Sequence, residues 1–423
     1  AMDARNTLLE SMTDEVEFLV LRDNYLQNQA ISVMERMSVS RIGAKQHFIR
    51  TLEGQGLLDR QLEFLPSDAE FAERKARGIG LTRPELSILL SYSKIVLFQQ
   101  LLDSDVPEDP FLSRELVRYF PKALQERHRD AMERHRLRRE IIATAVTNSM
   151  VNRMGATFVM RMQEDTGEAP GQIAKAYSIA REVLAARELW SEIEALDGKV
   201  HGNAQIDALL KIWNLMRHLT RWLLNLPGHR LDIAAAVDRY AAGMKELRDC
   251  LPGCLSEGDR QSTRGEVQQW IAAKFPEKLA EQLSSLHALM SALDIIEVAR
   301  VRNLPVRRVA EVYYALGEVL HLKWLTAKIE ELPVEGRWHA HARGTLRDEL
   351  FAQQQALAGQ ILAGGDGVDG ATLVDRWLRR EDPALRFTVS MFADMRSQVA
   401  MDYPTVSVAV RRLSQLANAG MIG

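Results

Sequence analysis

The amino-acid sequence predicts an all-α fold, a multi-helix antiparallel bundle or array of helical hairpins without a substantial sheet. Apolar residues recur at intervals of three and four, as in Leu86, Leu89 and Leu90, whereas strand-like alternation is scarce. Short breaks separate stretches of ordinary helical length, and short connections favour antiparallel packing of neighbours. These observations together predict the all-α class.

Three helix starts can be predicted from capping residues. Thr82 and Glu85 have the spacing of a capping box, in which each side chain bonds the other residue's backbone amide, and Pro84 suits the first turn. Ser67 and Glu70 repeat that spacing. Asp109 followed by a proline provides another N-cap signal.

Proline, glycine and short polar residues mark the predicted ends of helices. The breaks fall at Pro66, 104–110, Pro121, 166–171, 197–198, 227–228, 250–258, Pro276, 304–305, 333–336 and 364–370. The longest periodic stretch runs from Pro121 to about Glu164 and would be a spine about 60 Å long if unbroken. Gly155 is the point where this spine is expected to bend.

The length of 423 residues is compatible with two or three domains. We predict N-terminal helices over residues 1–80, a central long-helix bundle over 81–228 and a C-terminal helical subdomain over 229–423. Ala1 and Met2 look like a cloning remnant, which suggests that the chain is cut from a longer polypeptide.

The composition limits the classes of partner. With 54 lysine and arginine residues against 57 aspartate and glutamate residues, the net charge of -3 gives no general footprint for nucleic acid or membrane. No apolar run reaches the roughly 18 residues that span a bilayer. We therefore expect a cytoplasmic protein. Cys250 and Cys254 alone provide no disulfide framework and no four-ligand zinc set.

A dense basic run extends from Arg127 to Arg139. On one continuous helix, Arg127 with Arg134 and His128 with His135 would share a face, so the cations would form a stripe. Such a stripe can bind phosphate or an acidic partner. However, acidic residues alternate with the basic ones and aromatic residues for base stacking are missing, so a solvated or domain-facing surface is favoured over nucleic-acid binding.

Thr144, Asn148 and Asn152 form a polar ladder with a spacing of four on an otherwise apolar helix. Buried amides need hydrogen-bonding partners, because leaving one unpaired costs about 1 to 3 kcal/mol. The ladder can serve a helix-to-helix network, lie on the wet side of the spine or be a docking strip for another domain.

The sequence motifs that suggest catalysis or cofactor binding do not occur in the structural context that each of them requires. Residues 365–370 fit G-x-G-x-x-G, but residues 350–362 before them look helical, whereas a dinucleotide turn follows a strand. We expect a flexible loop between helices. His339 and His341 lie two residues apart and point away from each other on a helix, and Cys250 and Cys254 are expected on a turn. The residues thus predict no catalytic, cofactor-binding or metal site.

Several segments together carry a family resemblance. They are residues 80–94 (GLTRPELSILLSYSK), 135–144 (HRLRREIIAT) and 151–158 (VNRMGATF), with supporting matches at 12–16, 21–25, 189–190 and 195–197. The chain resembles the C-terminal helical region of the large NAD-specific bacterial glutamate dehydrogenases, from about Arg5 to about Leu416.

The resemblance implies a parent of well over a thousand residues, with an N-terminal regulatory region, a catalytic core and then this helical segment. Such a parent converts L-glutamate, NAD and water to 2-oxoglutarate, ammonium and NADH, and assembles as a homo-oligomer, expected to be a tetramer. The family's catalytic lysine and aspartate and its nucleotide-binding glycines lie in the core, so the resemblance implies no catalytic residue and no cofactor in this fragment.

We therefore predict a non-catalytic domain that packs against the core and neighbouring subunits. The candidate docking residues are Tyr25, Arg138, Arg139, Asn148, Asn152 and Arg153. The alternative from another class is a free-standing helical adaptor for protein partners.

Overall fold

The fold consists of α-helices, as predicted. The structure, a computed structural model, describes residues 2–226, 230–334, 336–364, 368–380, 382–397 and 400–419. Within these ranges there are 22 α-helices and two 3-10 helices, and no strand. None of the described helices combines the length and apolar character needed to cross a bilayer.

The chain forms two compact units. Unit 1 comprises residues 1–181 and 202–236, and unit 2 comprises residues 182–201 and 237–423. The sequence-based division at residues 80 and 228 stays a prediction.

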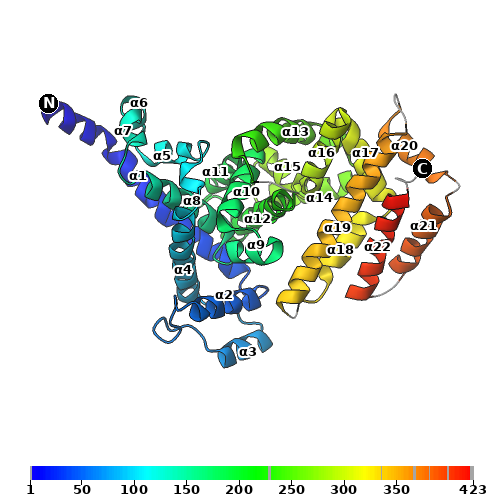
Figure 1. Cartoon of the computed structure of the whole chain (residues 1–423), viewed down its shortest axis with the longest axis horizontal. Coiled ribbons are helices and arrows are strands. Elements are labelled where there is room, and N and C mark those ends of the chain that lie inside the picture. The colour runs from blue at the N-terminus through cyan, green and yellow to red at the C-terminus, as the bar shows by residue number, and fades with distance from the viewer. Residues whose placement is uncertain are drawn as a thin grey trace. The chain divides into compact units, whose positions relative to one another are not determined.

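Unit 1 is built on the long helix α1 and the central pair α4 and α8, which pack on each other (Figure 1). Its helices are α1 (Met2–Arg36), α2 (Ile42–Gly54), α3 (Asp68–Ala76), α4 (Arg83–Leu102), η1 (Val106–Glu108), α5 (Ser113–Tyr119), α6 (Lys122–Arg127), α7 (Arg129–Glu133), α8 (Arg138–Met154), α9 (Phe158–Thr166), most of α10 (Pro170–Val183) and α12 (Gly202–Leu224).

Unit 2 packs α17 against α16, α19 and α20, and α19 against α22. Its helices are α11 (Ala186–Glu194), most of α13 (Ile233–Cys254), α14 (Glu257–Ala272), α15 (Glu277–Ser285), η2 (Ala288–Ser291), α16 (Ala292–Arg302), α17 (Val306–Val319), α18 (Leu322–Glu331), α19 (Arg337–Leu362), α20 (Gly370–Leu378), α21 (Pro383–Arg396) and α22 (Tyr403–Ala419).

The predicted capping boxes are confirmed at the starts of α3 and α4. Ser67 Oγ accepts from the Glu70 amide at 3.3 Å and Glu70 Oε2 accepts from the Ser67 amide at 2.7 Å. Thr82 and Glu85 form the same reciprocal pair. The helix start predicted at Asp109 is wrong, because α5 begins only at Ser113. The Asp109 carboxylate instead caps a turn before α5 by accepting from the amides of Phe111 and Leu112.

The predicted spine from Pro121 to Glu164 is wrong as a continuous helix. The segment contains α6, α7, α8 and α9. The backbone leaves helical geometry at His128 (φ -130°, ψ 26°) and Leu137 (φ -104°, ψ 28°), where His135 Nδ1 accepts from the Leu137 amide at 3.1 Å. Gly155 ends α8 at φ 81°. The predicted cationic stripe is also wrong, because it required one uninterrupted helix from Arg127 to Arg139.

The predicted turn at Cys250 to Cys254 is another error. Both cysteines lie in α13, which continues through Pro252 to Cys254, and the next helix starts after the N-cap Ser256. Proline lacks the amide that bonds to the carbonyl four residues earlier, so Pro252 predicts the end of the helix. The last turn of α13 nevertheless continues to Cys254.

Candidate interdomain docking site

Helix α8 carries five of the six predicted docking residues, and the structure divides them into separate environments. The helix packs on α1, α4 and α5, and buries Ile142, Val146 and Met150 among them. Arg138 and Arg153 lie 15 residues apart, or about 22 Å along the helix axis. The six predicted residues therefore do not form one compact cluster.

The N-terminal end of α8 is tied to the end of α4. The exposed Arg139 pairs with the Glu108 carboxylate, and its Nη2 donates to the Leu102 carbonyl at 2.6 Å. Arg138 is half-buried, and its Nε has no hydrogen-bond partner among the described residues. These two arginines therefore lie together, with Arg139 engaged inside unit 1.

The C-terminal end of α8 is connected to α1 through Gln29. Arg153 Nη1 donates to Gln29 Oε1 at 2.9 Å, and Gln29 Nε2 donates to the Tyr25 hydroxyl at 3.3 Å. The structure thus brings Tyr25 and Arg153 together through a residue that sequence reasoning missed. The only sequence feature that could have identified Gln29 is its position four residues after Tyr25, which places both residues on the same face of a helix.

The residues of the predicted polar ladder lie in two different environments along α8. Asn152 is buried, with 8% exposure, and its Oδ1 has no hydrogen-bond partner among the described residues. Thr144 and Asn148 instead line an open groove between α8 and α4. Thr147 also lines this groove, and its buried Oγ1 has no hydrogen-bond partner in the described part of the chain.

The groove between α4 and α8 has a volume of about 600 Å³. Its walls are largely apolar, and Ile95 and Leu57 are 63% and 49% exposed. Burial lowers the pKa of Lys94, and the nearby charge of Asp23 opposes that shift. The lining residues are Gln55, Leu57, Lys94, Ile95, Val96, Phe98, Gln99, Gln100, Thr144, Thr147 and Asn148. Asn148 was predicted as a docking residue and Thr144 as part of the polar ladder. None of the other lining residues was predicted, since their shared face depends on tertiary packing.

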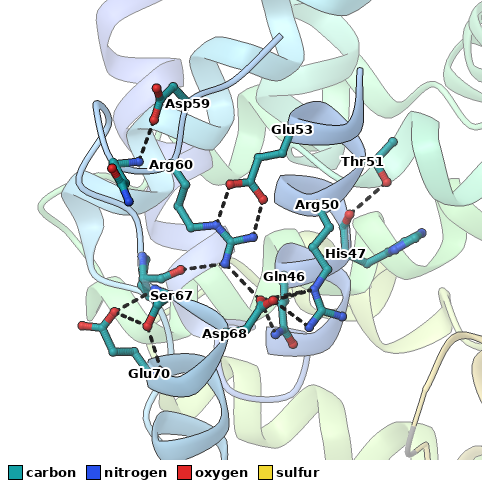
Figure 2. Close-up of polar contacts among 12 residues, drawn as sticks. Gln46, His47, Arg50, Thr51, Glu53, Asp59, Arg60, Ser67, Asp68 and Glu70 are labelled. Atoms are coloured by element: carbon teal, nitrogen blue, oxygen red, sulfur yellow. Dashed lines mark hydrogen bonds and ion pairs between the residues drawn. The ribbon is translucent and has the colours of Figure 1, made fainter. Parts of the chain in front are cut away.

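A polar cluster fixes the connection between α2 and α3 that carries Leu57. Figure 2 shows the Arg60 guanidinium between Glu53 at the end of α2 and Asp68 at the start of α3. Arg60 contacts them at 2.5 and 3.0 Å, and it also donates to the Pro66 carbonyl at 3.2 Å. Hydrogen bonds from Gln46, Arg50 and Arg60 lower the pKa of Asp68. The cluster is therefore a structural one that holds the groove wall in place.

The described residues include potential metal ligands and two cysteine thiols. No three His, Cys, Asp or Glu side chains among them gather as a metal site would require. Burial raises the pKa of Cys254 to about 12 and also raises the pKa of Cys250, which disfavours the nucleophilic thiolate in both.

The glycine-rich motif lies between helices. Residues 365–367 are outside the described residues, but α19 precedes the motif and α20 begins at Gly370. Asp369 caps α20 by accepting from the Thr372 amide at 2.9 Å. A Cβ atom on Gly370 would lie 2.6 Å from Glu311 Cβ and 2.8 Å from the Val312 amide nitrogen. This glycine therefore permits close packing of α20 on α17.

The chain matches known glutamate dehydrogenases over nearly its whole length. The family described as "Glutamate dehydrogenase, C-terminal" matches residues 78–415. The chain is 40% identical over 416 residues to the NAD-specific glutamate dehydrogenase of Halomonas elongata, covering 98% of this chain and 26% of that protein. It is 40% identical over 420 residues to the Pseudomonas aeruginosa enzyme of the same name, covering 99% of this chain and 26% of the relative.

The similarity extends to a more distant relative. The NAD-specific glutamate dehydrogenase of Mycobacterium tuberculosis is 32% identical over 426 residues, covering 100% of this chain and 26% of the relative. The chain therefore spans about a quarter of the length of these relatives. The resemblance inferred from the motifs is confirmed: this chain belongs to the glutamate dehydrogenase C-terminal family.

Proposed function

We propose that this chain is the non-catalytic C-terminal helical domain of a large NAD-dependent glutamate dehydrogenase. The parent polypeptide converts L-glutamate, NAD and water to 2-oxoglutarate, ammonium and NADH. The observation that carries the proposal is the match of 98% to 100% of this chain to only 26% of each NAD-specific relative. The all-α fold supports it, because dinucleotide folds use a parallel sheet and the described ranges contain no strand.

The proposed work of the domain is mechanical. Closure of domains around a substrate excludes water and commits the substrate to reaction, so a helical buttress can affect turnover without contacting the substrate. The proposed partners are the catalytic core of the same polypeptide and neighbouring subunits of a homo-oligomer, a tetramer, in the cytoplasm. Analytical ultracentrifugation of the longer protein tests the tetramer, and a sedimentation mass other than four chains contradicts it.

The division of labour is tested by assaying NADH formation with the 423-residue chain and with the full-length parent under identical glutamate and NAD concentrations. We expect activity from the parent and none from the chain above a heat-denatured control. NADH formation by the chain alone would contradict the non-catalytic assignment. A full-length parent without glutamate-dependent NADH formation would contradict the assigned reaction.

A further inference from the structure

The first part of α1 exposes several large apolar side chains, and four of them share one face of the helix. Met2, Leu9, Val16 and Val20 are separated by seven, seven and four residues, so they share one side of the helix. Their exposed fractions are 70%, 54%, 45% and 57%. Together they form a stripe about 27 Å long at 1.5 Å per residue. We call these four residues the α1 stripe.

Another side of the same helix is already engaged. Met12 is buried, and Glu15 Oε2 accepts from the Lys122 amide of α6 at 3.1 Å. Figure 1 shows α6 near this first half of α1, and the two helices pack on each other. The α1 stripe is therefore an additional apolar face on a helix whose packing inside unit 1 is provided by other residues.

The helix that carries the α1 stripe packs on α4 and α8, the two helices that border the groove. Asp23 lies three residues after Val20 and therefore on the same side of α1. Its charge acts on Lys94, which lines the groove. We call the α1 stripe and the neighbouring groove together the α1–groove surface.

The chemistry of the groove indicates what it would bind. Ile95 and Leu57 present exposed apolar side chains, and the buried Thr147 Oγ1 has no hydrogen-bond partner among the described residues. Lys94 is the one ionisable side chain among the described residues that line it. A complementary partner offers an apolar face, a hydrogen-bonding group and a carboxylate for Lys94.

We infer that the α1–groove surface binds the remainder of the parent polypeptide through a segment that offers an apolar face and a carboxylate. This inference rests on the proposed function. The matched relatives contain roughly three quarters of their length outside the matched region, since the chain covers 26% of each. A segment of the same polypeptide is covalently linked to this surface and is therefore present at high effective concentration. It can bind the surface without first associating from solution.

The occupancy of this surface can be measured by the rate of cysteine labelling. Ile95→Cys and Val16→Cys place a thiol at exposed positions in the groove and in the α1 stripe, and are made in the 423-residue chain and in the full-length parent. Val408→Cys on α22 is the matched control, since Val408 is 54% exposed in unit 2. The unsubstituted proteins give the background from native cysteines, which in the 423-residue chain are Cys250 and Cys254. Circular dichroism checks the fold of each variant.

We expect maleimide labelling at positions 95 and 16 to be at least about tenfold slower in the full-length parent than in the chain, as for a buried site, with less than about a twofold change at 408. Equal rates at 95 and 16 in both proteins would overturn the inference. Slowing in the chain alone that grows with its concentration would assign the surface to a second copy and also overturn it.

A second variant tests whether the covered groove depends on apolar contact. Ile95→Asp in the full-length parent should return the labelling rate of Val16→Cys to within about twofold of the rate in the isolated chain, because a buried carboxylate opposes docking. Val408→Asp should leave that rate unchanged. An Ile95→Asp parent that still protects position 16 would contradict a joint surface.

The test of the docking surface can fail or succeed independently of the test of the proposed function. Glutamate-dependent NADH formation by the parent, with unprotected positions 95 and 16, refutes the docking surface and leaves the function standing. Protected positions in a parent without that activity refute the function and leave the surface standing.

Discussion

At the scale of single residues, Lys45 is a charged group inside unit 1. It is 5% exposed, and its ammonium group contacts the carbonyl oxygens of Met34 at 3.4 Å and Met37 at 3.3 Å. Burial, with repulsion from Arg41, lowers its pKa from 10.5 to about 7. The folded chain therefore releases this proton at a lower pH than the unfolded chain.

The lowered pKa of Lys45 predicts how stability changes with pH. Between pH 7 and pH 10 the unfolded chain holds more protons at this site, so the free energy of unfolding rises with pH. We expect the wild-type chain to gain about 2 kcal/mol from pH 7 to pH 9 relative to Lys45→Met, measured by urea denaturation. The Lys45→Met variant lacks this titrating group. The difference between the two proteins therefore isolates the contribution of Lys45 from those of the other titrating groups. A constant difference between the two proteins across that range would contradict the shift.

Arg181 and Glu115 form a buried ion pair between α10 and α5. Their side chains are 1% and 9% exposed, Arg181 Nη2 lies 2.9 Å from Glu115 Oε1, and Arg181 Nη1 donates to Ser149 Oγ at 3.1 Å. Removing the arginine leaves a buried carboxylate with less compensation. Arg181→Met should therefore lower the free energy of unfolding by about 3 kcal/mol.

The control for this ion pair uses the same carboxylate. Arg118 pairs with Glu115 at 3.2 Å but is 47% exposed, so solvent screens the interaction. Arg118→Met should cost less than about 1 kcal/mol in the same denaturation experiment. Equal losses in the two variants would show that burial does not decide the contribution.

At the scale of secondary-structure elements, Gly155 determines where α8 ends. Its φ of 81° is rarely adopted by residues with a side chain, and a Cβ atom there would lie 3.2 Å from Met34 Cγ on α1. Gly155→Ala should lower the free energy of unfolding by about 2 kcal/mol, because it combines backbone strain with crowding.

A helical glycine provides the matched control for Gly155. Gly43 lies in α2, and a Cβ atom there has no neighbouring atom within 4 Å. Gly43→Ala should raise the free energy of unfolding by about 0.5 to 1 kcal/mol, because alanine lowers the conformational entropy of the unfolded chain. A neutral Gly155→Ala would show that neither the positive φ nor the contact with Met34 strains a side chain at this position.

At the scale of the whole molecule, the two units contain helices, buried ion pairs and a groove, and their described residues carry no strand for a dinucleotide fold. We expect 1 mM NAD, or NAD with glutamate, to shift the melting temperature of the 423-residue chain by less than about 1 °C, because only a ligand that binds the folded state stabilises it. The full-length parent, tested by scanning calorimetry at the same concentrations, should show a measurable rise. A rise in the isolated chain would indicate a nucleotide site within it.

The sequence by itself determined the all-α class, the capped starts of α3 and α4, and the family. These features are local, because a helix and its cap depend on partners three or four residues away. Ser67 with Glu70 and Thr82 with Glu85 were predictable for this reason. The family followed from strings of adjacent residues such as those at 80–94.

Only the tertiary structure decided how the candidate site is assembled. Arg153 and Gln29 are 124 residues apart, and the groove joins Leu57 to Lys94 and Asn148, so no local spacing could reveal these neighbours. The break at His128 was equally hidden, because residues 121–137 bury few side chains and therefore carry little apolar periodicity that could mark the end of a helix. Long-range packing selects among the contacts that a helical sequence allows, and it left Asn148 on an open groove while burying Asn152 four residues away.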